Sequence, residues 1–520
     1  MRPPNTGIPG WPKEIGAGKL LTVTRWCCRL LVCLVVVLCS CCSQRGGVRA
    51  GGGPSYDISG IELLVQTGDP QIDLAERYAL AVLGANYTGD AHVAAANYYD
   101  MPWIRDSFAW GMIPSLRDTS VSSYSSSEIA YWLDRQQPFG GWITAKLSGY
   151  FDETPILISS VLDAYDVTGN IGLVRSSLAR LERGWRWLAA GYIRPAKGSA
   201  WLLFATVPPH VAADWADQVG RTGYATQVEA LWYWATRSLG ILEGLTGHAP
   251  QAAYYADFAA HIRSDINTVL WTTSAPYTLD APAVGAFGHY RSWLGPRDYF
   301  ELDSNLLCVV YGIAGPAQTR SILQFVRAHG AYLLGLGTPD GVPAKVVYGD
   351  YSPLDYASKH DRLGPGQYQN GSWPTVGALA AMAFAQSGDT GEARAILQQL
   401  SGAVDRYDDL REWYTQDGTP QGAPSFQWAA RMFLVALYQA YLGVESCTSL
   451  QGGATLTDLR LRAPLGAGTA DVAFLGRRIH VVVKGHGPTV RLTVAGKTLA
   501  SRVVPGALLC SGCSLRANWQ

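Results

Sequence analysis

The connections between helical segments are the feature that most limits what this 520-residue chain can fold into. From about residue 70 to 442, apolar residues recur at helical spacing in a series of segments separated by two kinds of link. Short links contain glycine, as in DVTGN, LTGHAP, IAGPA and QSGDT, and they alternate with long links rich in Trp, Gly and Pro. The helices are expected to begin near Ile72, Arg105, Ser127, Glu153, Ile171, Ala225, Pro250, Asp303, Ala317, Ser372, Gly391 and Phe426.

Alternation of short and long links predicts a mainly α fold, a six-hairpin (α/α)6 toroid barrel over residues 61–444. Short turns would close one end of such a barrel, and the long loops would gather at the other. A helical solenoid is the alternative, but solenoid repeats should resemble one another and these segments do not. Long loops on a rigid scaffold commonly carry a functional site, so we expect the site at the long-loop end.

The pattern changes after Gly443. The stretches TLTDLRLRA, RRIHVVVKG and TVRLTVAGKTLASRVV alternate with period two and are broken by glycine turns, which indicates β-strands. Residues 445–520 are therefore expected to form a small β-sandwich domain.

The N-terminus has the pattern of a targeting segment. Arg25 and Arg29 precede LLVCLVVVLCSCC, an apolar run of signal-peptide length. LCSC resembles a bacterial lipobox, in which Cys41 would carry the lipid. We expect residues 1–43 to be a leader and 44–60 a flexible linker. The protein would then be secreted, or held at the cell surface or in the periplasm by a lipid anchor, its only contact with a membrane.

The cysteines outside the leader are Cys308, Cys447, Cys510 and Cys513. The C-x-x-C spacing of the last two is weak evidence for zinc without further ligands nearby, so no metal or organic cofactor is expected. In an oxidising compartment we expect a disulfide between Cys447 and one of the C-terminal pair.

The formal net charge of zero argues against nucleic acid as a partner, because nucleic acid requires a basic face. The 18 Trp and 27 Tyr are a high aromatic load, and Trp in loops suits the apolar faces of sugar rings. Each long loop combines an aromatic residue with a carboxylate or amide. We therefore expect the protein to bind an oligosaccharide or glycoside. We also expect it to be a monomer. The candidate substrate-binding residues are Trp103, Arg105, Asp106, Trp142, Asp152, Glu153, Trp215, Gln218, Asn370, Trp373 and Trp428.

Hydrolysis of a glycosidic bond needs two carboxyl groups that flank it. Asp217, beside Trp215, suits a proton donor whose pKa is raised by burial among aromatic residues. Glu412, beside Trp413 and Tyr414, suits the ionised partner.

Each candidate has a structural alternative. Asp217 could cap the following helix, and Glu412 could be a solvated acid like its neighbours. Asp152 and Glu153 could serve the dipole of their helix, and Arg105 with Asp106 could be a buried ion pair.

The motifs resemble those of a known superfamily. YQNGSWPTVGALAAMAFAQSGDTGEARAIL resembles the loop and helix of neutral/alkaline invertases. DWADQVGRTGYATQVEALWYWATR is similar to a stretch in the glucosidase domain of glycogen debranching enzymes. LREWYTQDG with SFQWAARMFLVAL, and PWIRDSFAW, resemble motifs of invertases and of the trehalase and processing α-glucosidase relatives.

This resemblance to six-hairpin glycosidases implies that Asp217 is the general acid and Glu412 the base. It implies a glycoside hydrolase that releases a terminal sugar, expected to be an α-glucoside, with inversion, and the N-terminal targeting segment indicates that this hydrolase is exported. One alternative is an inactive surface lipoprotein that binds glycans. Another is a phosphorylase, epimerase or lyase on the same barrel; HYRSW, with His289, Tyr290 and Arg291, is the one motif that hints at a lyase.

Overall fold

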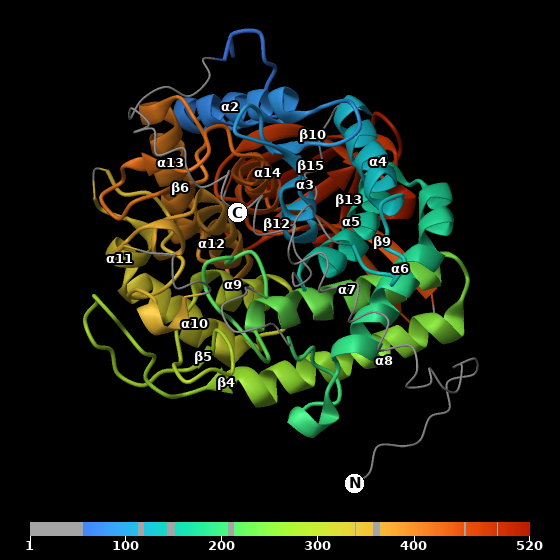
Figure 1. Cartoon of the computed structure of the whole chain (residues 1–520). Coiled ribbons are helices and arrows are strands. Elements are labelled where there is room, and N and C mark those ends of the chain that lie inside the picture. The colour runs from blue at the N-terminus through green and yellow to red at the C-terminus, as the bar shows by residue number, and fades with distance from the viewer. Residues whose placement is uncertain are drawn as a thin grey trace. The chain divides into compact units, whose positions relative to one another are not determined.

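The computed structural model describes residues 56–112, 119–142, 151–205, 213–338, 340–356, 364–451, 454–485 and 487–520 (Figure 1). The predicted leader, with Cys41, and most of the predicted linker lie outside these residues. Among the described helices, none is both long and apolar enough to cross a lipid bilayer.

Six helices form a closed inner ring. Each packs against the next in chain order, and the last packs against the first. Their residues are buried nearly all round, as in the helix whose side chains from Pro374 to Ala385 are all buried, which is the mark of a helix inside a core. The inner helices are α3 (Ile104–Phe108), α5 (Glu153–Thr168), α7 (Thr226–Leu245), α9 (Leu302–Val310), α12 (Pro374–Gln386) and α14 (Gln427–Ala436).

Six outer helices surround this ring and bury one face each. In α6 the buried residues include Val174, Leu178, Leu181, Trp185 and Leu188, spaced three or four apart. The outer helices are α2 (Pro70–Asn86), α4 (Thr119–Leu133), α6 (Ile171–Tyr192), α8 (Ala249–Asp265), α10 (Pro316–Ala328) and α13 (Thr390–Tyr407). The prediction of a mainly α, six-hairpin barrel is confirmed.

The observed helix starts agree closely with the sequence pattern, with one exception. The predicted start at Ser127 is wrong, because α4 already begins at Thr119. The first half of that helix reads TSVSSYSS, which has almost no apolar residue to mark a helical period. Elsewhere the local signals are ordinary ones: the Asp69 carboxylate caps α2 with Pro70 at the first position, and Gly169 ends α5 with a φ of 65°.

Short elements lie in the connections. Three two-stranded hairpins pair β2 (Val93–Ala95) with β3 (Tyr99–Pro102), β4 (Trp271–Thr272) with β5 (His289–Tyr290), and β6 (Trp413–Tyr414) with β7 (Pro420–Gln421). The remaining short helical pieces are η1 (Ala109–Gly111), η2 (Pro195–Lys197), η3 (Ile266–Leu270), α11 (Gly330–Leu334), η4 (Pro353–Asp355), η5 (Tyr368–Asn370), η6 (Leu437–Tyr441) and η7 (Gly506–Leu508).

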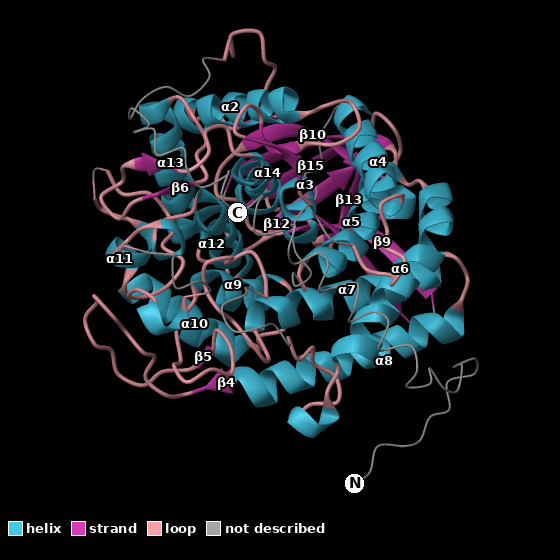
Figure 2. Cartoon of the chain, viewed as in Figure 1, coloured by secondary structure: helices cyan, strands magenta, loops and turns pink. Residues whose placement is uncertain are grey.

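Two antiparallel-rich sheets follow the barrel, and Figure 2 shows their strands gathered beside the helices. One sheet has the order β14 (Val503–Pro505), β9 (Ala454–Leu461), β8 (Val444–Gln451). The other has the order β1 (Val65–Gln66), β10 (Gly468–Phe474), β11 (Arg477–Gly485), β15 (Ser514–Trp519), β12 (Val490–Val494), β13 (Lys497–Leu499). All pairs are antiparallel except β11 with β15.

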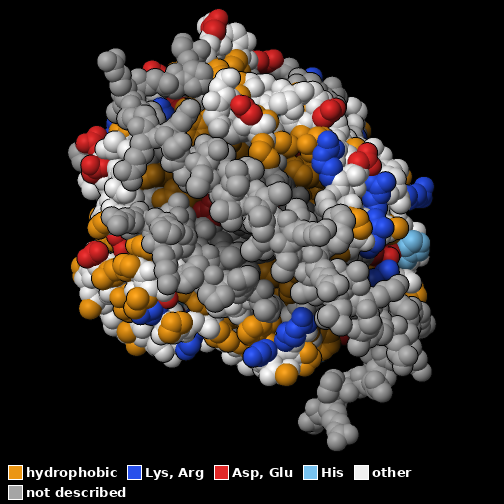
Figure 3. Space-filling model, in the orientation of Figure 1, with side chains coloured by type: hydrophobic (Ala, Val, Ile, Leu, Met, Phe, Trp, Pro, Cys, Tyr) orange, Lys and Arg blue, Asp and Glu red, His pale blue; other side chains and the backbone are white. Residues whose placement is uncertain are grey.

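The strands pack on the end of the barrel where the short turns lie. The amide groups of Leu475 and Gly476 donate to Asp166 O and Val167 O at the end of α5. β8 packs against α7 and η6. The edge strand β1 precedes the barrel in the chain, and the sequence pattern did not predict it. Its Val65 amide, like that of Leu64, donates to the buried Glu76 carboxylate of α2. The strands therefore cover the short-turn end, and the opposite, long-loop end, which is turned toward the viewer in Figure 3, remains as the place for a site.

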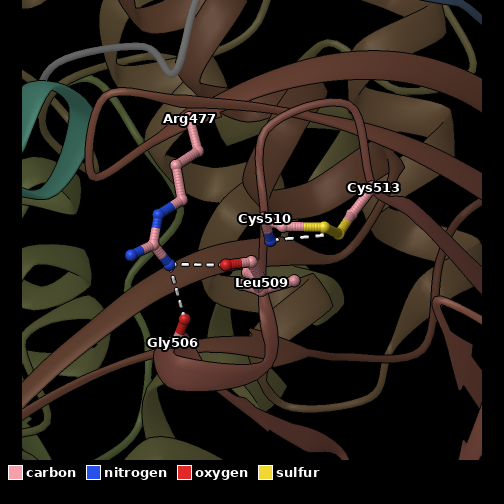
Figure 4. Close-up of a disulfide and its surroundings, with 5 residues drawn as sticks. All are labelled: Arg477, Gly506, Leu509, Cys510 and Cys513. Atoms are coloured by element: carbon pink, nitrogen blue, oxygen red, sulfur yellow. Dashed lines mark hydrogen bonds between the residues drawn. A yellow bond between two sulfur atoms is a disulfide. The ribbon is translucent and has the colours of Figure 1, made fainter.

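The predicted disulfide is wrong in its pairing. Cys510 bonds to Cys513, with Cα atoms 5.3 Å apart (Figure 4). Cys447 is free. Cys447 lies on β8, where its sulfur accepts from Arg460 at 2.9 Å. Arg477 donates to the carbonyl oxygens of Gly506 and Leu509 and so braces the loop that leads to Cys510. In the described residues, no group of three or more His, Cys, Asp and Glu could hold a metal ion.

Candidate active site

The long connections build one small cavity at their end of the barrel. It has a volume of about 130 Å³. Seven of its twelve lining residues are aromatic and four carry a charged group, a combination suited to the apolar faces and hydroxyl groups of a sugar. The lining residues are Ala94, Tyr99, Trp103, Arg105, Asp106, Trp215, Asp217, Tyr368, Trp373, Glu412, Phe426 and Trp428.

The aromatic walls hold one another in place. The Trp215 ring packs edge-on against the rings of Trp373 and Trp428, with ring centroids 4.8 and 5.6 Å apart. Trp428 in turn contacts the buried Trp110 at 4.8 Å. Trp373 Nε1 donates to Tyr368 O at 2.9 Å, which ties one loop to its own helix. Because each ring is packed against the next, the cavity is preformed.

Asp217 stands exposed at the cavity. Its Oδ1 accepts from Gln369 Nε2 at 3.1 Å and its Oδ2 from the Tyr368 hydroxyl at 3.5 Å, both from the loop that precedes α12. The capping alternative is wrong, because the residue at the N-cap of α7 is Ala225 and no side chain caps that helix end.

Glu412 lines the same cavity and is buried, with 4% of its surface exposed. Its Oε2 accepts from Ala423 N at 2.9 Å and from the Tyr99 hydroxyl at 3.3 Å. Burial, with a smaller contribution from the nearby carboxylates of Asp217 and Asp106, raises the pKa of Glu412 to about 8, although these two hydrogen bonds act to lower it. The alternative of a solvated acid is wrong.

The burial of the two carboxyl groups is opposite to the sequence-based expectation. Asp217 was expected to be buried among aromatic residues, yet Glu412 is the buried group with the raised pKa. The aromatic neighbour Trp215 turns into the core while Asp217, two residues on, faces solvent. A sequence neighbour therefore did not reveal the environment of the carboxyl.

Arg105 and Asp106 reach the cavity from the inner helix α3. Arg105 Nη2 lies 3.5 Å from Asp152 Oδ1 and 3.7 Å from Glu153 Oε1. Burial raises the pKa of Asp106 to about 7, and Arg105 acts in the opposite direction. These two ion pairs join Arg105 to the start of α5, behind the cavity wall. They hold its guanidinium at the cavity, where Asp106 also lies.

Eight of the thirteen residues predicted for the site line this cavity, and five lie outside its wall. Asp152 and Glu153 are buried behind Arg105. Trp142 is buried and its Nε1 donates to Trp132 O at 2.7 Å. Asn370 is buried, and its Oδ1 accepts from Tyr351 N at 2.9 Å. Gln218 is half-buried beside the cavity residue Asp217.

Tyr99, Tyr368 and Gln369 contact the two carboxyl groups and were missed from the sequence. Tyr99 donates to Glu412, and Tyr368 and Gln369 donate to Asp217. All three stand in the loop motifs YYDMPW and GQYQNGSWP, but tyrosine and glutamine are common in loops. Tyr368 is also unusual in its backbone, which has a left-handed conformation with a φ of 49°. The sequence gives no sign of this conformation.

No protein-family model matches the sequence, and no curated protein matches it. Solved structures match the fold. A GH78 family rhamnosidase of Bacillus sp. GL1 has a TM-score of 0.52 at 13% identity, over 81% of this chain and 41% of that one. This chain therefore spans less than half of the rhamnosidase.

Two proteins from Thermus thermophilus match over 69% of this chain and 99% of their own. They are an uncharacterized conserved protein (TM-score 0.49, 15% identity) and a GH63 mannosylglycerate hydrolase (TM-score 0.48, 16% identity). The rhamnosidase match, together with the closed ring of six inner helices, shows that the chain has a six-hairpin (α/α)6-barrel fold, as the resemblance implied.

Proposed function

We propose that this protein is a glycoside hydrolase that removes a terminal sugar. The observation that carries the proposal is that Asp217 and Glu412, from two different long loops, both line one small aromatic cavity. Its volume of about 130 Å³ is well below the roughly 300–1,000 Å³ of pockets for larger ligands. A single terminal ring suits that space better than the interior of a long chain.

Binding would use the walls and the charged pair of α3. Trp103, Trp215 and Trp373 offer apolar surface to the C–H faces of the ring. The Arg105 guanidinium donates hydrogen bonds and Asp106 accepts them, so the two together suit a pair of neighbouring hydroxyl groups.

In the proposed reaction Asp217 donates a proton to the glycosidic oxygen as its bond to the anomeric carbon breaks. Glu412 takes a proton from the water whose oxygen bonds to that carbon from the opposite face, which inverts the configuration. A carboxylate with a pKa of about 8 is a stronger base than an ordinary one, and its Oε2 is held as an acceptor by Ala423 N and Tyr99.

One proton serves both groups near neutral pH. In the empty site burial keeps it on Glu412. A bound sugar covers the exposed Asp217, and loss of solvent favours the neutral, proton-donating form of that carboxyl. Glu412 is then left ionised as the base.

The finer assignment to an α-glucoside is supported by the motifs shared with invertases and debranching enzymes. Export is supported by the apolar run after Arg25 and Arg29, with Cys41 as the proposed lipid site. We propose a monomer that uses neither a metal nor an organic cofactor.

The test is a screen of the protein without residues 1–43 against aryl glycosides and α- and β-linked disaccharides. Asp217→Asn and Glu412→Gln variants are screened beside it. We expect release of a monosaccharide by the parent protein and a loss of about 10²–10⁴-fold in kcat for each variant. No cleavage, together with a glycan that raises Tm, would instead support a binding protein.

A further inference from the structure

A fully buried charge network lies under the loop that carries Asp217. Its centre is Arg221, none of whose side chain is exposed. Arg221 Nη1 lies 2.8 Å from Asp214 Oδ2, and Arg221 Nη2 lies 2.8 Å from Glu301 Oε1. Asp214 and Glu301 are also fully buried, so this ion pairing is sheltered from water and salt.

Asp214 and Arg221 stand at the two ends of the same loop. Their ion pair closes the segment 214–221 on itself, with Asp217 between them. Asp214 Oδ1 also accepts from Ala216 N at 3.0 Å, and Asp217 N donates to Trp215 O at 2.8 Å, so the first half of the loop is a tight turn. The shape of the loop is fixed at its base.

The other arm of Arg221 fixes this loop to the inner ring. Glu301 is the residue before α9. Its Oε1 also accepts from the Tyr351 hydroxyl at 2.6 Å and its Oε2 from Ser304 Oγ at 2.8 Å. Two residues further along, Asp303 Oδ2 accepts from Trp215 Nε1 at 2.8 Å. Two buried carboxylates at the start of α9 therefore hold the loop on either side of Asp217.

Asp217 lies midway along this fixed segment, and its side chain is exposed at the cavity. Its carboxyl accepts hydrogen bonds from Gln369 at 3.1 Å and from Tyr368 at 3.5 Å. The backbone of the segment sets the point from which this carboxyl reaches the cavity. Proton transfer to a glycosidic oxygen is sensitive to placement, since a displacement of about 1 Å can cost roughly 10²-fold in rate.

We propose that Arg221 is a positioning residue for Asp217: it joins Asp214 to Glu301 and so sets where the acid stands at the cavity. The inference rests on the proposed function. Lysine cannot reproduce the arrangement, because Arg221 holds the two carboxylates with two separate nitrogens fixed in one plane, and the N–H groups of lysine all diverge from a single nitrogen on a flexible stem.

The test compares Arg221→Lys with Asp217→Asn on two glycosides of the sugar that the screen identifies. One has an alkyl leaving group, which needs a proton, and the other a 2,4-dinitrophenyl group, which leaves without one. Arg221→Lys should lose about 10–100-fold in kcat on the alkyl glycoside and under about 3-fold on the activated one, with KM little changed. Asp217→Asn should show the same selectivity more strongly.

Arg431→Lys is the matched control. Arg431 is also buried, 2.8 Å from the Glu128 carboxylate, and it does not line the cavity. A merely structural effect would lower the rate on both substrates by the same factor. If Arg431→Lys loses any activity, we expect such an equal loss on the two substrates. If Arg221→Lys does not fold, Glu301→Gln takes its place, because glutamine keeps the side-chain volume of Glu301 and an oxygen that accepts from Arg221. It should lose more activity on the alkyl glycoside than on the activated one, by a smaller factor than Arg221→Lys.

Equal losses on the two glycosides for Arg221→Lys, or for Glu301→Gln in its place, would overturn the inference. If Asp217→Asn itself loses both substrates equally, the acid assignment in the proposed function fails instead. The two failures are therefore distinguishable.

Discussion

Replacement of Glu412 by glutamine should stabilise the protein by a margin that grows with pH. The pKa of this carboxyl rises from an ordinary 4.5 to about 8 in the folded protein. Between those values the folded state holds a proton that the unfolded chain has lost, so stability falls as pH rises through this window. The penalty is absent well below pH 4.5 and complete above about pH 8.

The size of the effect follows from the pKa difference. At about 1.36 kcal/mol for each pH unit, the raised pKa of Glu412 lowers the free energy of unfolding by about 1 kcal/mol at pH 5, about 3 at pH 7 and about 5 at pH 9. Glutamine keeps the side-chain length and can accept from Ala423 N and Tyr99 as Glu412 does. The free energy of unfolding of Glu412→Gln minus that of the parent should therefore grow by about 4 kcal/mol between pH 5 and pH 9.

Urea unfolding at pH 5, 7 and 9 measures this difference. The matched control is Glu76→Gln, since Glu76 in α2 is also buried with a pKa raised to about 8, but lies away from the cavity. It should show a similar pH dependence while activity is kept. A difference for Glu412→Gln that does not change with pH would refute the reasoning that burial at the cavity raises this pKa.

Three further results are expected. The pH profile of kcat/KM should fall above about pH 8, because the pair Asp217 and Glu412 then loses the proton that the reaction needs; a rate that stays level to about pH 10 would contradict this. Tyr99→Phe removes a hydrogen bond that lowers the pKa of Glu412, so this alkaline limb should move to higher pH in the same assay, and a shift downward would be inconsistent with the contact. Reducing the Cys510–Cys513 bond should lower the free energy of unfolding in urea by only about 2 kcal/mol, because the loop that the bond closes is short. Reduction should leave activity unchanged, and a loss of activity would mean that this loop contributes to the function.

The helical part of the fold could be predicted from the sequence because each inner and outer helix carries its own apolar period. Where that signal is missing, as in the serine-rich start of α4, the prediction failed by eight residues. The strand β1 could not be found in this way, because a two-residue edge strand has no period and gains its partner, β10, from far along the chain. The cysteine pairing failed because Cys510 and Cys513 lie close enough to bond to each other in the loop between η7 and β15, whereas Cys447 lies on the strand β8.

The site was predictable where residue type is decisive. Carboxylates and tryptophans in long loops pointed to Asp217, Glu412 and most of the aromatic wall. Burial was not predictable, because it depends on how the loops turn: Glu412 is enclosed and Asp217 exposed, against expectation. Arg221 was not identified, since its partner Glu301 is 80 residues away in the sequence and the two meet only in the folded barrel.

The most direct test of the central claim is the configuration of the released sugar. Proton NMR during the first minutes of hydrolysis, before mutarotation, distinguishes the two anomers. If Asp217 is the acid and Glu412 activates a water, the first product must have the anomeric configuration opposite to that of the substrate. A first product of the same configuration would mean that a carboxyl attacks the sugar directly, and it would contradict the role of Glu412 as base.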